Sequence, residues 1–158
     1  MSASDPRSPA AQRFSWLVAD VYELAGELER AGELLARSVG QSGARWKVLS
    51  AASVNGQTVA QLARRLGLAR QSVQRVADAL EHDGLVDYQS NPDHQRSPRV
   101  ALTAQGEQVL DRLSAAAAKW EDPLAVQLRR DELEHTRAFI QSLVQLVRAH
   151  RPQTRRRS

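Results

Sequence analysis

The pattern of apolar and polar residues between positions 58 and 102 predicts two short helices followed by a hairpin of two strands. Apolar residues recur every three or four positions from Thr58 up to Gly67, and again from about Ala69 up to Gly84. A glycine stands directly after each stretch, where a helix ends most easily. The inward-facing positions are Val59, Leu62, Ala63, Leu66, Val73, Val76, Ala77 and Leu80.

Thr58 is the predicted cap of the first of these helices. Gln61 stands three residues later, which completes a capping box in which the two side chains satisfy each other's backbone N–H groups. Such a box marks where a helix begins, so it sets the start of the pair of helices at residue 58.

A polar tip separates the two predicted strands. Leu85, Val86 and Tyr88 open one extended segment, residues 99–102 form the other, and residues 90–98 lie between them. Two helices, a strand, a tip and a strand are the order of a winged helix-turn-helix, with the tip as the wing. The alternative at this level is a small globular core without further function.

Charge favours DNA as the partner of this segment. The stretch from residue 40 to residue 77 contains no Asp or Glu, and it holds the six basic residues Arg45, Lys47, Arg64, Arg65, Arg70 and Arg75. A surface of this kind is attracted to phosphates whatever the DNA sequence. The net charge of +4 carries less weight, because four arginines among the last eight residues supply all of it.

The motifs of this segment resemble the multiple antibiotic resistance regulator (MarR) family of bacterial transcription factors. The run VAQLARRLGLARQSVQRVADALEHDGLV, followed by NPDHQRSPRVALTAQG, contains LA-x-x-L-G, L-x-x-D-G-L-V, a polar wing with arginine, and L-T-x-x-G. The resemblance covers the central third of the chain. It implies a dimeric, sequence-specific DNA-binding regulator, interpreted as a repressor relieved by a small, often aromatic, ligand.

The second helix and the wing hold the predicted DNA contacts. Near the start of such a helix, side chains meet base edges in the major groove, so Arg75 and Gln71 are expected to contact bases and Arg96 the adjacent minor groove. The full predicted set is Arg70, Gln71, Ser72, Gln74, Arg75, His94, Arg96 and Arg99. The alternative function is a winged-helix module for protein contact, which would need an apolar outer face on the second helix.

Two positions depart from the family's pattern. Ala69 stands where the family usually has a capping Ser or Thr, which should weaken the start of the second helix by about 1 kcal/mol. His94 stands where the family usually has the Asp that braces the wing arginine, and the neighbouring Asp93 is the available substitute.

A long helix is predicted at the N-terminal end, from about Ala10 to Val39. Its apolar stripe comprises Phe14, Val18, Val21, Ala25, Leu28, Leu35 and Val39, widened by Leu17, Leu24 and Leu34. This stripe is wide enough to touch both its own domain and a second subunit, the alternative being a thick core helix. A shorter helix over residues 44–53 follows as the floor of the helix-turn-helix, with Trp46 interpreted as a core residue. Asn55 and Gly56 make the turn to Thr58.

Two further helices are predicted after the hairpin. Thr103 caps the first, whose inward positions are Gly106, Val109, Leu110, Leu113, Ala117 and Trp120. It is expected to kink at Pro123, or to restart there with Asp122 as cap. Asp131, with Glu134, is the predicted cap of the last helix, whose apolar set is Leu133, Phe139, Ile140, Leu143, Val144, Leu146 and Val147. The resemblance implies that these helices pair with a second copy of the chain.

These expectations divide the chain into five parts. They are a mobile tail over residues 1–12, a dimerisation helix over 13–40, the winged helix-turn-helix domain over 41–102, dimerisation helices over 103–150 and a basic unstructured tail over 151–158. The expected fold class is mainly α with a small β-hairpin wing, flanked by long dimerisation helices. The expected partners are an inverted-repeat DNA operator, a second copy of the chain and a small aromatic ligand.

Composition narrows the functions that remain open. In a chain of 158 residues, a hydrophobic content of 42% is enough for a real core. The absence of cysteine excludes disulfides, thiolate metal sites and thiol redox switches. No apolar run approaches the roughly 20 residues of a membrane-spanning helix, and a secretion signal is not seen. We therefore expect a cytoplasmic protein without a membrane partner.

The sequence offers no recognisable catalytic or metal-binding arrangement. His82, His94, His135 and His150 lie far apart and form no His-x-x-x-His pair, and there is no glycine-rich phosphate loop. His82 beside Asp83 is interpreted as a solvated helix end rather than a metal site. We therefore predict no enzymatic activity, catalytic residue, metal or cofactor.

Overall fold

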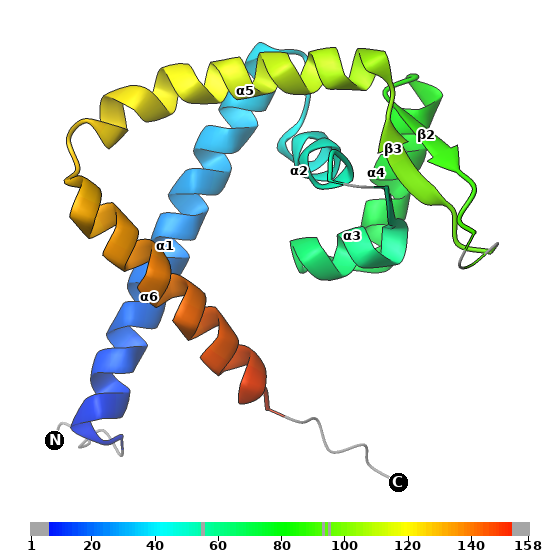
Figure 1. Ribbon diagram of the computed structural model, residues 1–158. Helices are drawn as coiled ribbons and strands as arrows, with labels where there is room; N and C mark the ends of the chain where they lie inside the picture. Colours follow the sequence, from blue (N-terminus) through cyan, green and yellow to red (C-terminus); the bar gives the residue numbers. More distant parts are fainter. Residues whose placement is uncertain (1–6, 55, 93, 95, 153–158) are drawn as a thin grey trace, which may run out of the picture. The chain divides into compact units, whose positions relative to one another are not determined.

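The computed structural model describes residues 7–54, 56–92, 94 and 96–152 (Figure 1). Helices dominate it, with a small antiparallel sheet near the middle of the chain, which confirms the predicted fold class. The elements are α1 (Pro9–Ser38), α2 (Gly43–Ala52), β1 (Gln57–Thr58), α3 (Val59–Leu66), α4 (Arg70–His82), β2 (Val86–Gln89), β3 (Arg99–Leu102), α5 (Ala104–Ala125) and α6 (Arg130–Ala149).

The chain divides after Ala117 into two compact units. The first holds α1, the winged helix-turn-helix and the greater part of α5. The second holds the end of α5 and α6. No described helix is long and apolar enough to cross a membrane.

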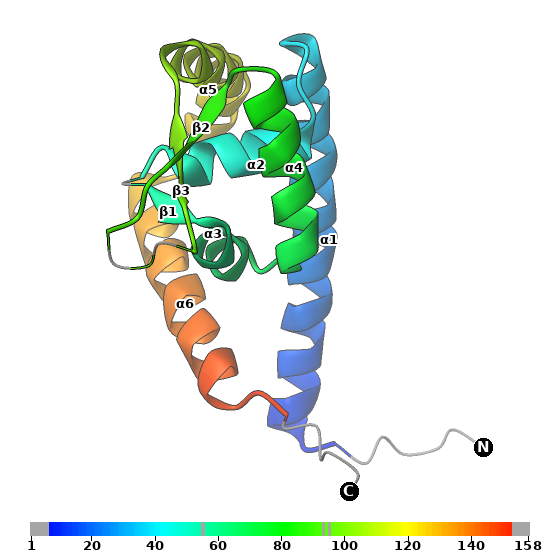
Figure 2. The same ribbon diagram turned by 90° about the vertical axis from the view of Figure 1, so that its right-hand side faces the viewer.

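The core of the first unit is built by α2, α3, α4, the sheet and the start of α5, which gather beside α1 (Figure 2). The predicted inward positions of α3 and α4 are buried, except that Leu66 and Val76 are partly exposed and pack against the core. Trp46 also packs against the core without being buried in it. The largest fully buried side chains are Leu49, Leu62, Leu80, Leu113, Val48, Val73, Val86 and Val100.

The helix-turn-helix begins and ends as its sequence predicts. The Thr58 N–H donates to Gln61 Oε1 at 2.8 Å, and the Gln61 N–H donates to Thr58 Oγ1 at 3.3 Å, which completes the capping box. Gly67 ends α3 in the left-handed region with a φ of 67°. Ala69 precedes α4, and no side chain caps that helix.

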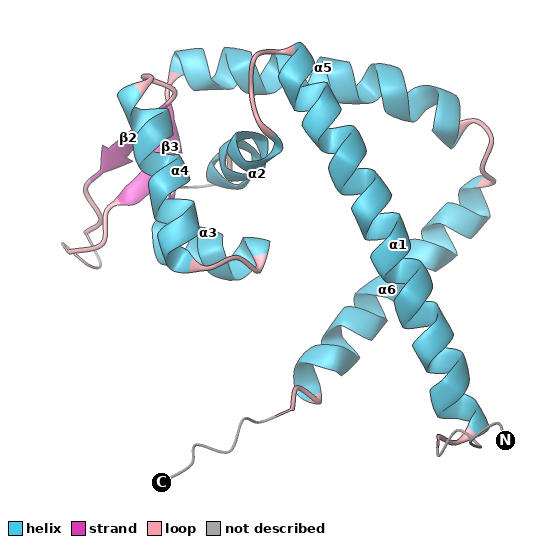
Figure 3. Ribbon diagram, turned by 180° about the vertical axis from the view of Figure 1, so that it is seen from behind, coloured by secondary structure: helices cyan, strands magenta, loops and turns pink. Residues whose placement is uncertain are grey.

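The wing sheet has three strands in the order β1-β3-β2, one more than the hairpin that the sequence predicted. In the hairpin, Val86 pairs with Leu102 and Tyr88 with Val100, and the strands lie beside α4 (Figure 3). The additional strand, β1, is only two residues long and pairs with the other edge of β3. Two residues are too few for an alternating pattern to show. The predicted turn residue Asn55 lies outside the described residues.

Thr103 joins the start of α5 to the end of the α4–β2 turn. Its hydroxyl donates to the Gly84 carbonyl at 2.7 Å and accepts from the Gly106 N–H at 3.0 Å, so it caps α5 as predicted. Its own N–H donates to the Leu85 carbonyl at 3.1 Å. A Cβ added to Gly106 would lie only 1.9 Å from that same carbonyl oxygen, so only glycine fits at this crossing.

Polar contacts connect α1 to α2. Glu33 of α1 accepts a hydrogen bond from the Gly43 N–H at 2.7 Å, at the start of α2, and it also bonds Arg37 at 2.9 Å. The Gly43 N–H, and then Arg37, hold the pKa of the Glu33 carboxyl below its ordinary value. The Glu33 carboxylate of α1 therefore helps to hold the start of α2, on which the helix-turn-helix packs.

Three details of the helix ends differ from the sequence prediction. The first helix begins at Pro9, inside the segment expected to be a mobile tail, because Ser8 caps it and proline suits the first helical position. No restart occurs at Asp122, because α5 continues through Pro123 to Ala125. The last helix begins at Arg130, so Asp131 lies inside its first turn rather than capping it.

Candidate nucleic-acid interface

The outer face of α4 is polar, as DNA binding requires. Arg70, Gln71 and Arg75 are exposed, while Ser72 and Gln74 are half-buried. An apolar outer face, which a protein-contact module would need, is not present on α4. Local packing explains the arrangement, because Val73 and the other apolar residues of the helix turn toward the core.

Two of the six basic residues in the acid-free stretch are paired with acids elsewhere in the chain. Arg45 Nη2 lies 2.6 Å from Asp83 Oδ2, and Lys47 Nζ lies 2.8 Å from Glu29 Oε1. The absence of Asp and Glu from the stretch led us to expect that all six charges lack a counter-charge, and this expectation was wrong. It failed because the partner acids lie outside the stretch in sequence and meet it only in the fold.

The other four basic residues of the stretch make no ion pair with a described residue, and the same holds for Arg96 on the wing. The four are Arg64, Arg65, Arg70 and Arg75. They lie on α3 and α4, so the uncompensated charge is concentrated on the helix-turn-helix. The positive surface is smaller than the sequence indicated, but it is better placed for phosphate contact.

Backbone hydrogen bonds close the tip of the wing. Asn91 is only 5% exposed, and its Nδ2 donates to the Ser97 carbonyl at 3.0 Å. The His94 N–H donates to the Asn91 carbonyl, and the Ser97 N–H to the His94 carbonyl. Both His94 and Arg96 have exposed side chains. Asp93, the predicted substitute brace, lies outside the described residues.

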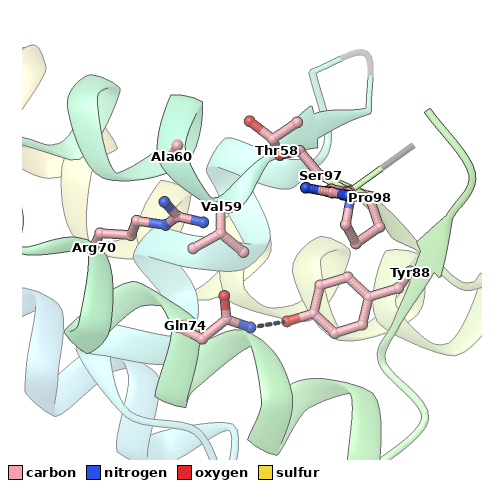
Figure 4. Close-up of a pocket in the computed structure, with 9 residues that line it drawn as sticks. Thr58, Val59, Ala60, Arg70, Gln74, Tyr88, Ser97 and Pro98 are labelled. Atoms are coloured by element: carbon pink, nitrogen blue, oxygen red, sulfur yellow. Dashed lines mark hydrogen bonds between the residues drawn. The ribbon is translucent and has the colours of Figure 1, made fainter. Parts of the chain in front are cut away.

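A groove of about 290 Å³ brings the start of α3, the start of α4 and the wing together (Figure 4). Arg70 and Arg96, far apart in sequence, both line it. The full lining is Thr58, Val59, Ala60, Arg70, Gln74, Tyr88, Arg96, Ser97 and Pro98. Arg64, His94 and Arg99 line a second cavity of about 630 Å³, which shares Thr58, Ala60 and Ser97 with the groove. Arg99 itself is half-buried within β3.

A hydrogen-bonded triangle of Gln74, Asp78 and Tyr88 joins α4 to β2. Gln74 Nε2 lies 2.8 Å from both Asp78 Oδ1 and the Tyr88 hydroxyl, and that hydroxyl lies 2.6 Å from Asp78 Oδ1. Partial burial, and then the bond to Asp78, raise the pKa of the Tyr88 phenol well above its ordinary value. The sequence missed this triangle because Tyr88 was assigned only a strand role.

Comparison with known proteins decides the class of protein. The family model described as "MarR family" matches residues 39–97. An uncharacterised protein of Mycobacterium tuberculosis is 43% identical over 136 residues, which are 86% of this chain and 95% of that protein. The transcriptional activatory protein BadR of Rhodopseudomonas palustris is 30% identical over 117 residues, covering 72% of this chain and 65% of BadR.

The chain belongs to the MarR family. It is therefore a DNA-binding transcriptional regulator and not an enzyme, as the sequence predicted. Among the described residues, no group of three or more His, Asp or Glu side chains could hold a metal ion. Asp83, beside His82, is instead paired with Arg45.

Solved structures of transcriptional regulators share the fold of this chain. The MarR family regulator SP03579 covers 89% of this chain and 93% of its own, with a TM-score of 0.76 at 22% identity. The M. tuberculosis regulator MosR, solved with DNA, covers 85% and 98%, with a TM-score of 0.68 at 23% identity. PcaV of Streptomyces coelicolor, solved with its natural ligand, covers 92% and 98%, with a TM-score of 0.65 at 24% identity.

Proposed function

We propose that this MarR-family protein is a sequence-specific regulator that inserts α4 into the major groove and places the wing at the adjacent minor groove. The observation that carries the proposal is the groove where Arg70 of α4 and Arg96 of the wing meet, next to the exposed Gln71 and Arg75. A duplex lying over this groove would meet positive charge from both elements at once. MosR, which shares this fold, was solved in complex with DNA, and this supports DNA binding by the present chain.

Within this arrangement, Gln71 and Arg75 read bases, whereas Arg70, Ser72 and Arg96 position the backbone or the minor groove. The direct test measures binding to the DNA immediately upstream of the protein's own gene and to random DNA of equal length. Gln71→Ala or Arg75→Ala should cost about 1 to 3 kcal/mol on a true operator and far less on random DNA. An equal loss on both would show that these side chains only grip phosphate.

The functional unit in this proposal is a homodimer. The described residues of α6 include none that is buried, and Phe139, Ile140 and Val144 are each more than 40% exposed. In α1, Ala36 alone is buried, while Leu24 and Leu28 are more than half exposed. Soluble proteins seldom leave such apolar faces in water. Pairing about a two-fold axis would cover them and would present two recognition helices to an inverted repeat.

Sedimentation tests the dimer independently of DNA. The intact protein at micromolar concentration should sediment as a dimer, and a chain ending before Asp131 should lose both solubility and operator binding. A stable monomer that binds a single half-site tightly would contradict the proposed role of the terminal helices.

We further propose that the bound dimer represses by blocking polymerase and that a small aromatic ligand relieves it. PcaV, which shares this fold, was solved in complex with its natural ligand, and this supports a ligand-binding role. In this chain a cavity of about 300 Å³ lies beside Trp46, with Lys47 and Arg65 also lining it. A ligand there would shift the population of conformations that bind DNA. A reporter under the upstream DNA should fall when the protein is expressed; a rise would make it an activator, as BadR is named.

A further inference from the structure

We propose that Gln74 is a specificity-determining residue that reads one base through its carbonyl oxygen alone, and that Asp78 and Tyr88 are the positioning residues that hold it so. This inference rests on the proposed function, because it requires α4 to lie in the major groove. It assigns Gln74 a defined chemistry, where the sequence only placed this residue among the predicted DNA contacts.

The orientation of the Gln74 amide follows from its partners. The amide atom 2.8 Å from Asp78 Oδ1 must be the nitrogen, because a carboxylate can only accept hydrogen bonds. The Tyr88 hydroxyl has a single hydrogen, which it donates to Asp78 Oδ1 at 2.6 Å. That hydroxyl is therefore an acceptor for Gln74 Nε2 at 2.8 Å. The opposite orientation of the amide would place its oxygen against two other oxygens.

The amide oxygen is consequently the polar atom that Gln74 offers to a ligand. Gln74 lines the groove together with Arg70 and Arg96. Figure 4 shows the amide nitrogen toward Tyr88 and the oxygen turned away from it, on the side of Val59. Within the described part of the chain, the oxygen accepts no hydrogen bond. It remains available to a donor that enters the groove.

This orientation changes what the side chain can recognise. An unrestrained glutamine pairs with adenine through two hydrogen bonds, one of which uses its NH2 group on adenine N7. In this protein the NH2 group is held by Asp78 and Tyr88, so that pairing is not available. The oxygen can accept only from an exocyclic amino group, at adenine N6 or cytosine N4. Guanine O6 and thymine O4 are acceptors and would oppose it. Gln74 should therefore prefer an amino base over a keto base.

Tyr88 ties this preference to the wing. It lies on β2, fourteen positions after Gln74, and is partly buried against the core. The orientation of the amide thus depends on the correct packing of the hairpin against α4. Asp78 lies one turn after Gln74 on the same helix, so its carboxylate meets the amide without backbone rearrangement.

Selection from a library of duplex DNA with a random central segment tests the inference with the full chain. Wild-type protein should select a motif with one position in each half-site where A or C is preferred over G or T. Gln74→Ala should abolish the preference at that position and so identify it. Asp78→Asn supplies an N–H donor, which allows the Gln74 amide to rotate by half a turn. Tyr88→Phe removes the hydroxyl that accepts from Gln74 Nε2. Each should weaken the preference roughly threefold to tenfold at that position alone.

Glu81→Gln is the matched control for charge, because it removes one negative charge from the same helix and acts on Tyr88 only through its charge, with no hydrogen bond to the triangle. It should tighten binding to all sequences alike and leave base preference unchanged. If the wild type selects a motif and both Asp78→Asn and Tyr88→Phe keep its preferences, the inference is overturned while the proposed function stands. If the wild type selects no motif, both are overturned. Circular dichroism melting shows whether each variant is folded. If Asp78→Asn does not fold, Tyr88→Phe, which keeps the aromatic ring, still tests the inference.

Discussion

Replacement of Gly106 by alanine tests the close contact between α5 and the backbone at Leu85. The new Cβ would lie 1.9 Å from the Leu85 carbonyl oxygen and 3.0 Å from its carbonyl carbon. A real Cβ essentially never comes within 3.0 Å of a neighbouring atom, so α5 and the backbone at Leu85 must separate by about 1 Å. Because both contacts are to backbone, no side chain can move aside to make room.

The cost can be worked from the bonds that such a shift strains. Thr103 donates to the Leu85 and Gly84 carbonyls, and each bond contributes about 1 kcal/mol. Val109 and Leu113, carried by the same helix, would lose close packing in the core, which adds roughly 1 to 3 kcal/mol. The better helix propensity of alanine offsets about 1 kcal/mol. We expect Gly106→Ala to lower the free energy of unfolding by roughly 2 to 4 kcal/mol.

Urea unfolding followed by circular dichroism measures this difference. All variants must be compared at one protein concentration, because the stability of a dimer depends on it. Gly32→Ala is the matched control: it lies inside α1, and its nearest neighbour to a new Cβ is Trp46 Cζ3 at 4.0 Å. It should gain about 0.5 to 1 kcal/mol. A Gly106→Ala protein as stable as the wild type would refute the close approach of α5 to the backbone at Leu85.

Four further results are expected. Ala69→Ser should cap α4 and raise the free energy of unfolding by about 1 kcal/mol in the same urea assay, and no gain would mean that the helix start is already satisfied. The pKa of Tyr88 is raised in the folded protein, so the stabilisation contributed by its neutral hydroxyl is fully present below the ordinary tyrosine pKa of about 10 and is lost as pH rises through the higher folded value. The difference in the free energy of unfolding between wild type and Tyr88→Phe should therefore shrink above about pH 10. A difference that stays constant would contradict the network. Arg96→Ala should weaken operator binding without changing the melting temperature or the dimer, and His94→Asp should tighten binding if the wing lacks its acidic brace. Unchanged affinity of His94→Asp from about pH 5 to about pH 8, a range that spans the ordinary histidine pKa, would mean that Asp93 supplies the brace or that no brace is needed.

The parts of this structure that the sequence predicted correctly depend on neighbours in the chain. The capping box at Thr58 and Gln61 spans three residues, and the apolar faces of α3 and α4 repeat within a turn. Such signals are readable because the interacting groups lie at fixed short separations. Local signals also misled at Asp131, where a plausible cap residue lies inside the helix because Arg129 and Arg130 extend it.

The contacts that the sequence could not predict join distant positions. Arg45 and Asp83 are 38 residues apart, Lys47 and Glu29 are 18 apart, and Gln74 meets Tyr88 across 14. No local spacing encodes these pairs, because they form only after helices and strands pack. They alter the interpretation of the site, since they decide which basic residues and which amide atoms remain available.

The division of basic residues into paired and unpaired ones limits how steeply DNA affinity should fall with salt concentration. Arg45 and Lys47 serve the fold, whereas Arg64, Arg65, Arg70, Arg75 and Arg96 are not paired with any described residue. Each phosphate that a protein neutralises contributes about 0.9 to the slope of log affinity against log salt concentration. Even if all five arginines contacted phosphate, the slope would reach only about 4.5 per subunit. A steeper slope would mean that Arg99 or the arginines after residue 150 join the contact, or that paired residues such as Arg45 exchange their acid for DNA.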